Sequence, residues 1–471
     1  MKLKRIIAEL LLCVLLLPVS VSALGESGGA PSITAKYAVL VDADTDTILY
    51  RKNMNDRIRP ASLTKMMTLL VSFEQNKQRL NDFITVTAEM IDVPAGSSSA
   101  NLCDGDMISI HDLFYAMMLP SGNDAAKVLA YVTSGSETAF AELMNARAAE
   151  LGMENTHYEN AHGFDQDGHY TTAYDLSLLA RKLCATPELV EVFSTYRYTA
   201  AVYPGGDMNN KKEMEYYNTN TMLNPNSQAH LDGLKGIKTG YTVLAGNCLA
   251  SYMEKDNRHL VSIVAFSDQG SRDNDTRALF RYGRESFDTF DKDTVFSSKR
   301  IVVDVENADQ GDESNGQLEL YLEPGTSGGF MTVSKDDGSK IRTFQNSVIT
   351  VRYPTVTAPV TAGDYVGDVE FVYNSEVVYT ARALASRTVD ANTVSPSDLV
   401  SLGIKGKTRI SFGFLSNRYF LIPFFSVVAL ALIVWGGITV RKRRAKQVRS
   451  RQRNVTRKKQ PSTRPGNRTM L

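Results

Sequence analysis

The chain contains 471 residues, and its 52 Lys and Arg balance 52 Asp and Glu, so the formal net charge is zero. This balance is uneven, because residues 441–471 contain 13 Lys and Arg without an acidic residue, and residues 1–23 carry a net charge of +2. Residues 24–440 therefore carry a net charge of −15. So acidic a segment argues against nucleic acid as its binding partner.

The first 23 residues have the three-part pattern of a secretory signal peptide. Lys2, Lys4 and Arg5 precede the apolar stretch Leu10–Leu17, and the small residue Ala23 ends a cleavage site. Roughly 395 residues then precede the membrane-span candidate described below, which is too many for one compact core. We therefore expect two domains outside this span.

Strand and helix patterns alternate in the first domain, which we place at residues 32–275. Tyr37–Asp42 and Thr47–Tyr50 read as a hairpin, and a mainly helical block follows from residue 62 to about residue 183. Cys248–Met253 and Leu260–Phe266 form a second predicted hairpin. Strands at both ends with helices between them predict an α+β fold, an antiparallel sheet flanked by helices.

Ser62 and Lys65 stand at the start of an apolar, helix-patterned run. Residues three apart on a helix share a face, so the Lys65 amine can reach the Ser62 hydroxyl. A hydroxyl needs such a base to become a nucleophile, and Lys65 can act as one if burial or the nearby positive charge of Lys238 lowers its pKa. Ser62 is therefore the predicted nucleophile and Lys65 the predicted base.

Two further motifs follow in the chain. Ser121-Gly122-Asn123 comes after the apolar pattern of residues 113–119, where an ordinary turn with a helix cap is the alternative interpretation. Lys238-Thr239-Gly240 lies at a predicted strand. The order Ser-x-x-Lys, Ser-x-Asn, Lys-Thr-Gly is close to the motif set of penicillin-binding proteins and class A β-lactamases.

The sequences around these motifs closely resemble those of the serine-type D-alanyl-D-alanine carboxypeptidases, the low-molecular-mass penicillin-binding proteins. The resemblance spans about residues 35–270 and is carried by residues 59–68, 121–126, 163–176 and 238–242. It implies a β-lactamase/transpeptidase-like first domain followed by a β-rich second domain.

The resemblance also implies roles for the motif residues. Ser121 would relay a proton to the leaving amine, and Asn123 would orient Lys65 and bind the substrate amide. Lys238 and Thr239 fit recognition of a terminal carboxylate, and Gly240 lets the peptide approach the backbone. The backbone N–H groups of Ser62 and Tyr241 would form an oxyanion hole, although Tyr241 replaces the histidine or small hydroxyl residue often found there.

The segment between these motifs contains a group of His and Asp residues that could suggest a metal. It lacks the His-Glu-x-x-His pattern of zinc peptidases and the spacing of a calcium loop, so we expect no metal or other cofactor. We expect a loop packed near the active site. The residues concerned are His157, His162, His169, Asp165 and Asp167.

The cysteines point to no redox or metal motif. Cys103, Cys184 and Cys248 remain after the leader is removed, an odd number that leaves at least one free thiol. One disulfide among the three is possible, and the sequence does not choose between the pairings.

After about residue 292 the pattern changes to short β-type runs, for which we predict a small β-sandwich at residues 292–394 with no helical period. Its strands are expected at Arg300–Val305, Gln317–Leu322, Val348–Val351 and Val369–Tyr379. Residues 395–418 would form a stalk.

Residues 419–440 form an uncharged apolar stretch of about 33 Å as a helix, long enough to span a bilayer. The basic tail 441–471 then lies in the cytoplasm by the positive-inside rule and contacts anionic lipid headgroups, with nucleic acid as the less favoured partner. We predict a single-pass protein of the cell membrane with an extracellular catalytic part.

The predicted function is that of a D-Ala-D-Ala carboxypeptidase, which removes the terminal D-alanine from peptidoglycan pentapeptide stems through a serine acyl-enzyme and is inhibited by β-lactams. The alternatives are a DD-transpeptidase, which passes the acyl group to an amine, and a non-hydrolytic penicillin-binding receptor. A class A β-lactamase is disfavoured because no Glu-x-x-Leu-Asn string lies between Ser121 and Lys238.

Overall fold

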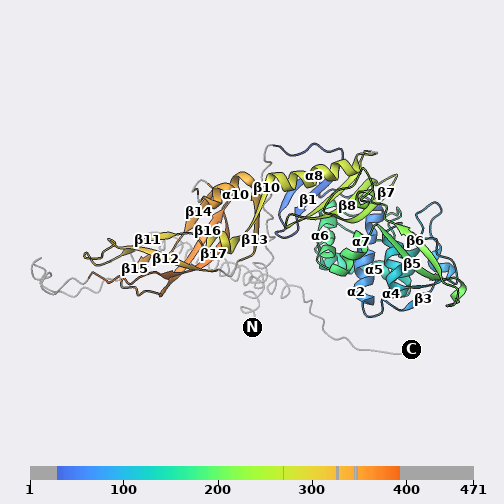
Figure 1. Ribbon diagram of the computed structural model, residues 1–471, viewed down its shortest axis with the longest axis horizontal. Coiled ribbons are helices and arrows are strands. Elements are labelled where there is room, and N and C mark those ends of the chain that lie inside the picture. Colours follow the sequence, from blue (N-terminus) through green and yellow to red (C-terminus); the bar gives the residue numbers. More distant parts are fainter. Residues whose placement is uncertain (1–28, 269, 325–327, 344, 346–347, 393–471) are drawn as a thin grey trace, which may run out of the picture. The chain divides into compact units, whose positions relative to one another are not determined.

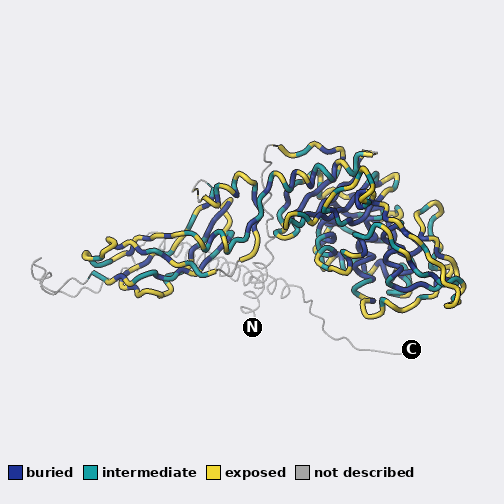
Figure 2. Tube along the Cα trace, viewed as in Figure 1, coloured by how far each residue is buried: buried dark blue, intermediate teal, exposed yellow. Residues whose placement is uncertain are grey.

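The structure is a computed structural model that describes residues 29–268, 270–324, 328–343, 345 and 348–392. Its strands and helices divide between two sets of hydrophobic cores, one set within residues 33–287 and the other within residues 290–389 (Figures 1 and 2). The predicted signal peptide, stalk, membrane span and basic tail lie outside the described residues.

A five-stranded antiparallel sheet forms the centre of the first region, with the strand order β2-β1-β9-β8-β7. β1 pairs with β9, far along the chain, so that Tyr37 lies opposite Ala265. The five strands are β1 (Tyr37–Asp42), β2 (Ile48–Lys52), β7 (Leu234–Thr242), β8 (Gly246–Lys255) and β9 (Arg258–Ser267).

Helices bury both faces of this sheet. Val39 and Val41 of β1 join the core shared with helices α2 and α6, whereas Ala38 and Leu40 join the core shared with α8. This alternation follows the two-residue period of a strand. The helices of this region are α2 (Lys65–Asn76), α3 (Ile110–Met118), α4 (Asn123–Ser134), α5 (Glu137–Glu150), α6 (Ala173–Cys184), α7 (Pro187–Ser194) and α8 (Arg272–Ser286).

A second, four-stranded sheet in the order β3-β4-β5-β6 was not expected from the sequence. Its strands are β3 (Phe83–Thr85), β4 (Met107–Ser109), β5 (Arg197–Tyr203) and β6 (Lys212–Tyr217). Four short 3-10 helices complete the region, namely η1 (Ala61–Thr64), η2 (Ala88–Ile91), η3 (Pro204–Gly206) and η4 (Thr221–Leu223).

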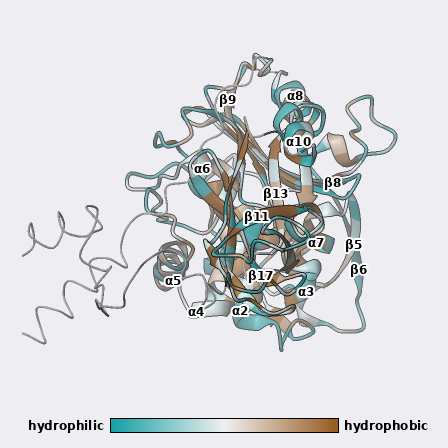
Figure 3. Cartoon of the chain, turned by 90° about the vertical axis from the view of Figure 1, so that its left-hand side faces the viewer, coloured by the Kyte–Doolittle hydropathy of each residue, from teal (hydrophilic) through white to brown (hydrophobic). Residues whose placement is uncertain are grey.

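Helix α8 was also missed. It begins at Arg272 and continues past residue 275, where we placed the domain boundary, and its Leu279 and Phe280 are buried against the central sheet. In Figure 3 the helix is coloured mainly hydrophilic, because few of its residues face the core. A boundary at residue 275 would therefore cut a helix that belongs to the first core.

The second region is rich in strands, as predicted. Six strands follow the order β14-β16-β17-β12-β11-β15, and β10 pairs with β13 in a separate two-stranded sheet. The strands are β10 (Phe287–Asp291), β11 (Ile301–Glu306), β12 (Gln317–Glu323), β13 (Phe330–Ser334), β14 (Ile349–Arg352), β15 (Val356–Thr357), β16 (Tyr365–Tyr373) and β17 (Glu376–Ala385).

Two expectations for this region were wrong. The run Val369–Tyr379 is not one strand, because Asn374 and Ser375 take positive φ angles of 50° and 70° and turn β16 into β17. The region also contains two helices, α9 (Lys292–Phe296) and α10 (Lys335–Arg342), where we expected no helical period. Ser334 caps α10 by accepting a hydrogen bond from the Asp337 N–H.

In the part of the chain that the structure describes, no helix is both long enough and apolar enough to cross a bilayer. The predicted span at residues 419–440 lies outside that part.

Candidate active site

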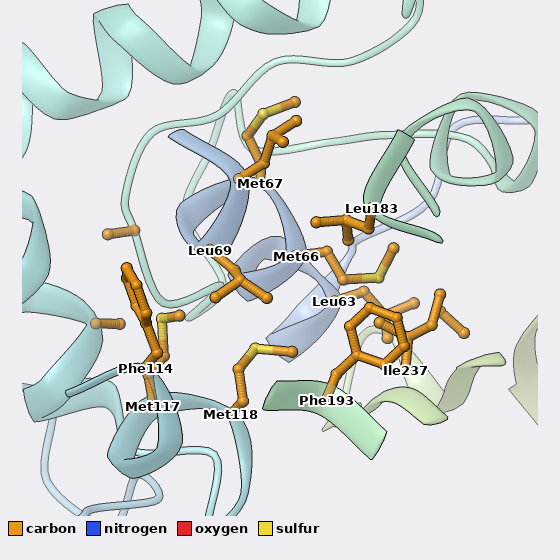
Figure 4. Close-up of a cluster of buried hydrophobic side chains, with 14 of the residues drawn as sticks. Leu63, Met66, Met67, Leu69, Phe114, Met117, Met118, Leu183, Phe193 and Ile237 are labelled. Carbon is orange, nitrogen blue, oxygen red and sulfur yellow. The ribbon is translucent and has the colours of Figure 1, made fainter. Parts of the chain in front are cut away.

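The turn that carries Ser62 and the helix that follows it pack against a methionine-rich hydrophobic core. Ser62 lies in η1, and Lys65 is the first residue of α2. Figure 4 shows the side chains that pack around this segment from other elements, including residues of α3 and β7. The labelled residues are Leu63, Met66, Met67 and Leu69 of the segment itself, and Phe114, Met117, Met118, Leu183, Phe193 and Ile237 of other elements.

The Lys65 amine is fully buried and lies among three oxygen atoms. Its Nζ is 3.1 Å from Ser62 Oγ, 2.6 Å from Asn123 Oδ1 and 2.8 Å from the backbone oxygen of His162. Burial, followed by the charge of Lys238, lowers the pKa of Lys65 well below its usual value, and Asp124 opposes this shift. A lysine in these surroundings can be a neutral amine and hence a base.

The Ser-x-Asn motif is the tight connection between α3 and α4. Ser121 takes a left-handed φ of 66°, and Asn123 starts α4, with its own N–H donating to the Ser98 carbonyl at 2.9 Å. The buried Asp124 accepts hydrogen bonds from Ser99 Oγ and the Ala100 N–H at 2.6 and 2.8 Å. These contacts hold residues 98–100 against the start of α4.

The Lys-Thr-Gly motif lies on β7, the strand at the end of the five-stranded sheet. Lys238 is buried, and burial together with Arg272 lowers its pKa to about 7. Thr239 Oγ1 lies 2.6 Å from Thr219 Oγ1. A side chain at Gly240 would place its Cβ 3.4 Å from the Ser62 N and 3.2 Å from the Ala61 Cβ, so the glycine permits close packing of β7 on η1.

The three motifs meet at one cavity of about 520 Å³. Six of the eight predicted site residues line it, whereas Lys65 and Lys238 are buried beyond its surface. The six are Ser62, Ser121, Asn123, Thr239, Gly240 and Tyr241, the last of which is 64% exposed.

The cavity also has walls that sequence reasoning missed. Arg272, Thr219 and the segment 96–98 line it. Arg272 belongs to α8, which was not predicted, and a lone Thr or Ser in a loop carries no recognisable signal. Only the three-dimensional arrangement brings them to the site.

The predicted loop of His and Asp residues does pack beside η1, which carries Ser62. His169 Nε2 is 2.9 Å from Thr64 Oγ1, and Arg59 forms an ion pair with Asp167 at 3.1 Å. The 162–165 segment lines the cavity. Within the described residues, no group of three or more His, Cys, Asp and Glu side chains is arranged to hold a metal ion.

The three cysteines are free thiols in this structure. Cys103 is exposed, Cys184 is half-buried and Cys248 is buried in β8. Burial raises the pKa of the Cys248 thiol to about 11, which leaves it in the unreactive neutral form.

Comparison with known proteins identifies the family of the chain. The family profile described as D-alanyl-D-alanine carboxypeptidase, a peptidase family, matches residues 25–268. The chain belongs to this family. The matched range includes all three motifs and ends just before α8.

Relatives within the carboxypeptidase family extend the similarity. The chain is 32% identical over 268 residues to the carboxypeptidase DacF of Bacillus subtilis, a match covering 55% of this chain and 66% of the relative, just under two thirds. It is 30% identical over 361 residues to DacC of Escherichia coli, covering 74% of this chain and 82% of the relative.

Solved structures of similar proteins share the fold. Penicillin-binding protein 5 of Haemophilus influenzae has a TM-score of 0.57 at 26% identity, covering 77% of this chain and all of that structure. A mutant of the Streptomyces K15 DD-transpeptidase has a TM-score of 0.51 at 29% identity, covering 54% of this chain and 99% of that structure.

Proposed function

We propose that this serine peptidase removes the terminal D-alanine from peptidoglycan stems ending in D-Ala-D-Ala, with Ser62 forming the acyl-enzyme. The observation that carries the proposal is the arrangement of oxygen atoms around the Lys65 amine. A neutral amine has two hydrogens and one lone pair. Asn123 Oδ1 and the His162 backbone oxygen can only accept, so they take both hydrogens and leave the lone pair for the Ser62 hydroxyl.

Acylation follows from this orientation. The Ser62 hydroxyl donates its proton to Lys65 Nζ as the Ser62 oxygen attacks the carbonyl carbon between the two D-alanines. The negative charge on the carbonyl oxygen is stabilised by the backbone N–H groups of Ser62 and Tyr241. Gly240 supports this geometry because it lets β7 lie directly against η1.

Departure of D-alanine requires a proton on its nitrogen. Ser121 lies in the same cavity as Ser62 and relays the proton from Lys65 to the leaving amine. A water then attacks the acyl carbon, again with Lys65 as the base, and the tetrapeptide leaves with Ser62 restored.

The positive charges on one side of the cavity suit the free carboxylate of the substrate. Lys238 lies behind Thr239, and Arg272 lines the cavity near them. Thr239 donates a hydroxyl hydrogen bond to the carboxylate. Since no strand pairs with the outer edge of β7 in the described part of the chain, a peptide can pair with that edge.

β-Lactams carry a carboxylate and a strained amide in a similar relation, so they acylate Ser62 in place of the stem peptide. Their acyl-enzyme is the inhibited form. Pentapeptide stems and β-lactams are therefore the proposed ligands of the cavity.

The decisive experiment is D-alanine release from a pentapeptide ending in D-Ala-D-Ala, with Ser62→Ala as the control. We expect many turnovers that both Ser62→Ala and penicillin abolish. Penicillin labelling of Ser62 without turnover would contradict the carboxypeptidase and favour a DD-transpeptidase or a penicillin-binding receptor. The similarity to the K15 DD-transpeptidase makes the former the second candidate, and an added acceptor amine would reveal it.

We also propose the topology predicted from the sequence: a cleaved leader at residues 1–23, an extracellular catalytic domain, a β-sandwich domain, a stalk at residues 395–418, a membrane helix at residues 419–440 and a cytoplasmic basic tail. The separate core at residues 290–389 supports a second domain, which would begin after α8. Protease added to intact cells should digest everything except the span and the tail, and survival of the catalytic domain would contradict this topology.

A further inference from the structure

The backbone oxygen of His162 takes one of the two hydrogens of Lys65, so its position decides where the lysine lone pair points. It belongs to the turn 160–164, which has no regular secondary structure of its own. Backbone in such a segment holds its place only through side-chain contacts, and these contacts lead to a residue outside the motifs.

The turn is held partly by its own side chains. Asn160 Oδ1 accepts from the Gly163 N–H at 2.7 Å, and Asn160 Nδ2 donates to the Phe164 carbonyl at 3.0 Å. From α2, Thr68 Oγ1 donates to the Ala161 carbonyl at 2.5 Å. These bonds fix both sides of residue 162 without fixing the imidazole of His162.

The imidazole is fixed from α5. Its Nδ1 accepts a hydrogen bond from the Phe164 N–H at 3.1 Å, so in the neutral ring the proton is on Nε2. Nε2 lies 3.4 Å from Glu137 Oε1, and the same oxygen lies 3.4 Å from the Ala161 N–H. One carboxylate oxygen therefore faces two donors of the turn.

Glu137 is suited to this task by its place in the fold. It is the first residue of α5, which Ser136 caps, and the partial positive charge at a helix N-terminus stabilises a carboxylate there. Its side chain is 25% exposed, against 7% for His162. Burial raises the pKa of Glu137, and the Ala161 N–H and Lys127 oppose this shift. Burial, followed by the charges of Lys65, His169 and Lys127, lowers the pKa of His162 to about 3, so its imidazole is neutral.

We propose that Glu137 is a positioning residue for the Ser62–Lys65 pair: through the His162 imidazole and the Ala161 N–H it holds the turn so that the His162 backbone oxygen accepts from Lys65. The proposal rests on the proposed function, since it concerns the base of that reaction. Glu137 itself does not line the cavity and touches no substrate.

The test is the rate of Ser62 acylation by benzylpenicillin as a function of pH, in the wild type and in Glu137→Ala and Glu137→Gln. Glutamine keeps an oxygen acceptor at the same place, whereas alanine removes it. We expect Glu137→Ala to acylate about tenfold more slowly at the plateau, a part of what general-base catalysis supplies. Glu137→Gln should stay within about twofold of the wild type.

The pH profile separates positioning from a loss of folding. Without its backbone acceptor, the Lys65 ammonium is less stabilised, so the acidic limb of the Glu137→Ala profile should move to lower pH. A partly unfolded protein would lose labelling stoichiometry and keep the shape of the profile. Glu142→Ala, at an exposed position of the same helix, is the matched control.

A Glu137→Ala profile that matches the wild type in plateau and limb would overturn the proposal. So would equal losses in Glu137→Ala and Glu137→Gln, which would assign the effect to charge. Failure of the proposed function itself is distinct, since the wild type would then release no D-alanine.

Discussion

Lys65 and Lys238 are two buried ammonium groups beside one cavity, and at the scale of single residues this proximity sets their charges. Burial disfavours both cations, and the charge of Lys238 further lowers the pKa of Lys65. Burial, followed by the charge of Arg272, lowers the pKa of Lys238 to about 7. In the proposed reaction the active state has a neutral Lys65 as the base and a protonated Lys238 for the substrate carboxylate.

This division predicts a bell-shaped pH dependence of kcat/KM. Activity rises as Lys65 loses its proton and falls above about pH 7 as Lys238 loses its own. Lys238→Arg should move the basic limb to higher pH, because a guanidinium stays charged. The measurement is D-alanine release across pH, normalised to penicillin-labelled enzyme, and an unmoved basic limb in Lys238→Arg would assign that limb to another group.

Single residues also show where sequence reasoning ends. Ser62, Ser121 and Thr239 could be found because short motifs carry them, and the structure places them at one cavity. Arg272 and Glu137 could not, because no motif carries them: Arg272 lines the cavity from α8, and Glu137 contacts the 160–164 turn from α5. Their contributions depend on tertiary distances, which no local pattern encodes.

At the scale of elements, the 160–164 turn packs closely against η1 at Gly163. Gly163 has a φ of +86°, and a Cβ there would lie 1.9 Å from the Ala61 backbone oxygen. Gly152 has a similar φ of +75° with nothing within 4 Å of an added Cβ. The two glycines share the backbone requirement and differ in the space around them.

Alanine at these two positions therefore separates strain from collision. Gly152→Ala should cost about 1 kcal/mol of unfolding free energy, from the left-handed φ alone. Gly163→Ala should cost more and should slow penicillin acylation of Ser62, because η1 must shift. Denaturant unfolding and acylation rates check both, and equal behaviour of the two variants would show that the site tolerates the shift.

Elements were predictable where their patterns were strong. β1, β8 and β9 have apolar residues on both faces, and their predicted bounds are close to those in the structure. Helix α8 was hidden because it has few apolar residues and contains Gly283, whose missing side chain lets Leu40 approach. β6 was hidden because most of its residues are exposed, including several charged ones.

At the scale of the whole molecule, the carboxylate of Asp42 joins distant parts of the chain. It is fully buried at the end of β1 and accepts from Arg258 Nη2 at 3.2 Å, from Thr289 Oγ1 of β10 at 3.2 Å and from Thr332 Oγ1 of β13 at 3.0 Å. Two backbone N–H groups of the following turn complete its partners. Every element it touches loses an acceptor if it is removed.

Asp42→Asn should lower the free energy of unfolding by about 3–5 kcal/mol, since it leaves the Arg258 charge without its buried partner. Glu215→Gln, which breaks the exposed ion pair with Arg197, should produce no measurable change. Calorimetric melting of the two variants checks both expectations. A melting temperature equal to that of the wild type for Asp42→Asn would show that the Asp42 carboxylate contributes little to stability.

The pairing of β1 with β9 also has a consequence for the order of events in folding. One edge of β1 stays unpaired until β9, near the far end of the domain, has been synthesised. Contacts so distant in sequence make folding slow. A ribosome must therefore complete nearly the whole domain before β7 can pack beside Ser62, and a chain interrupted before residue 258 would contain Ser62 without the complete sheet.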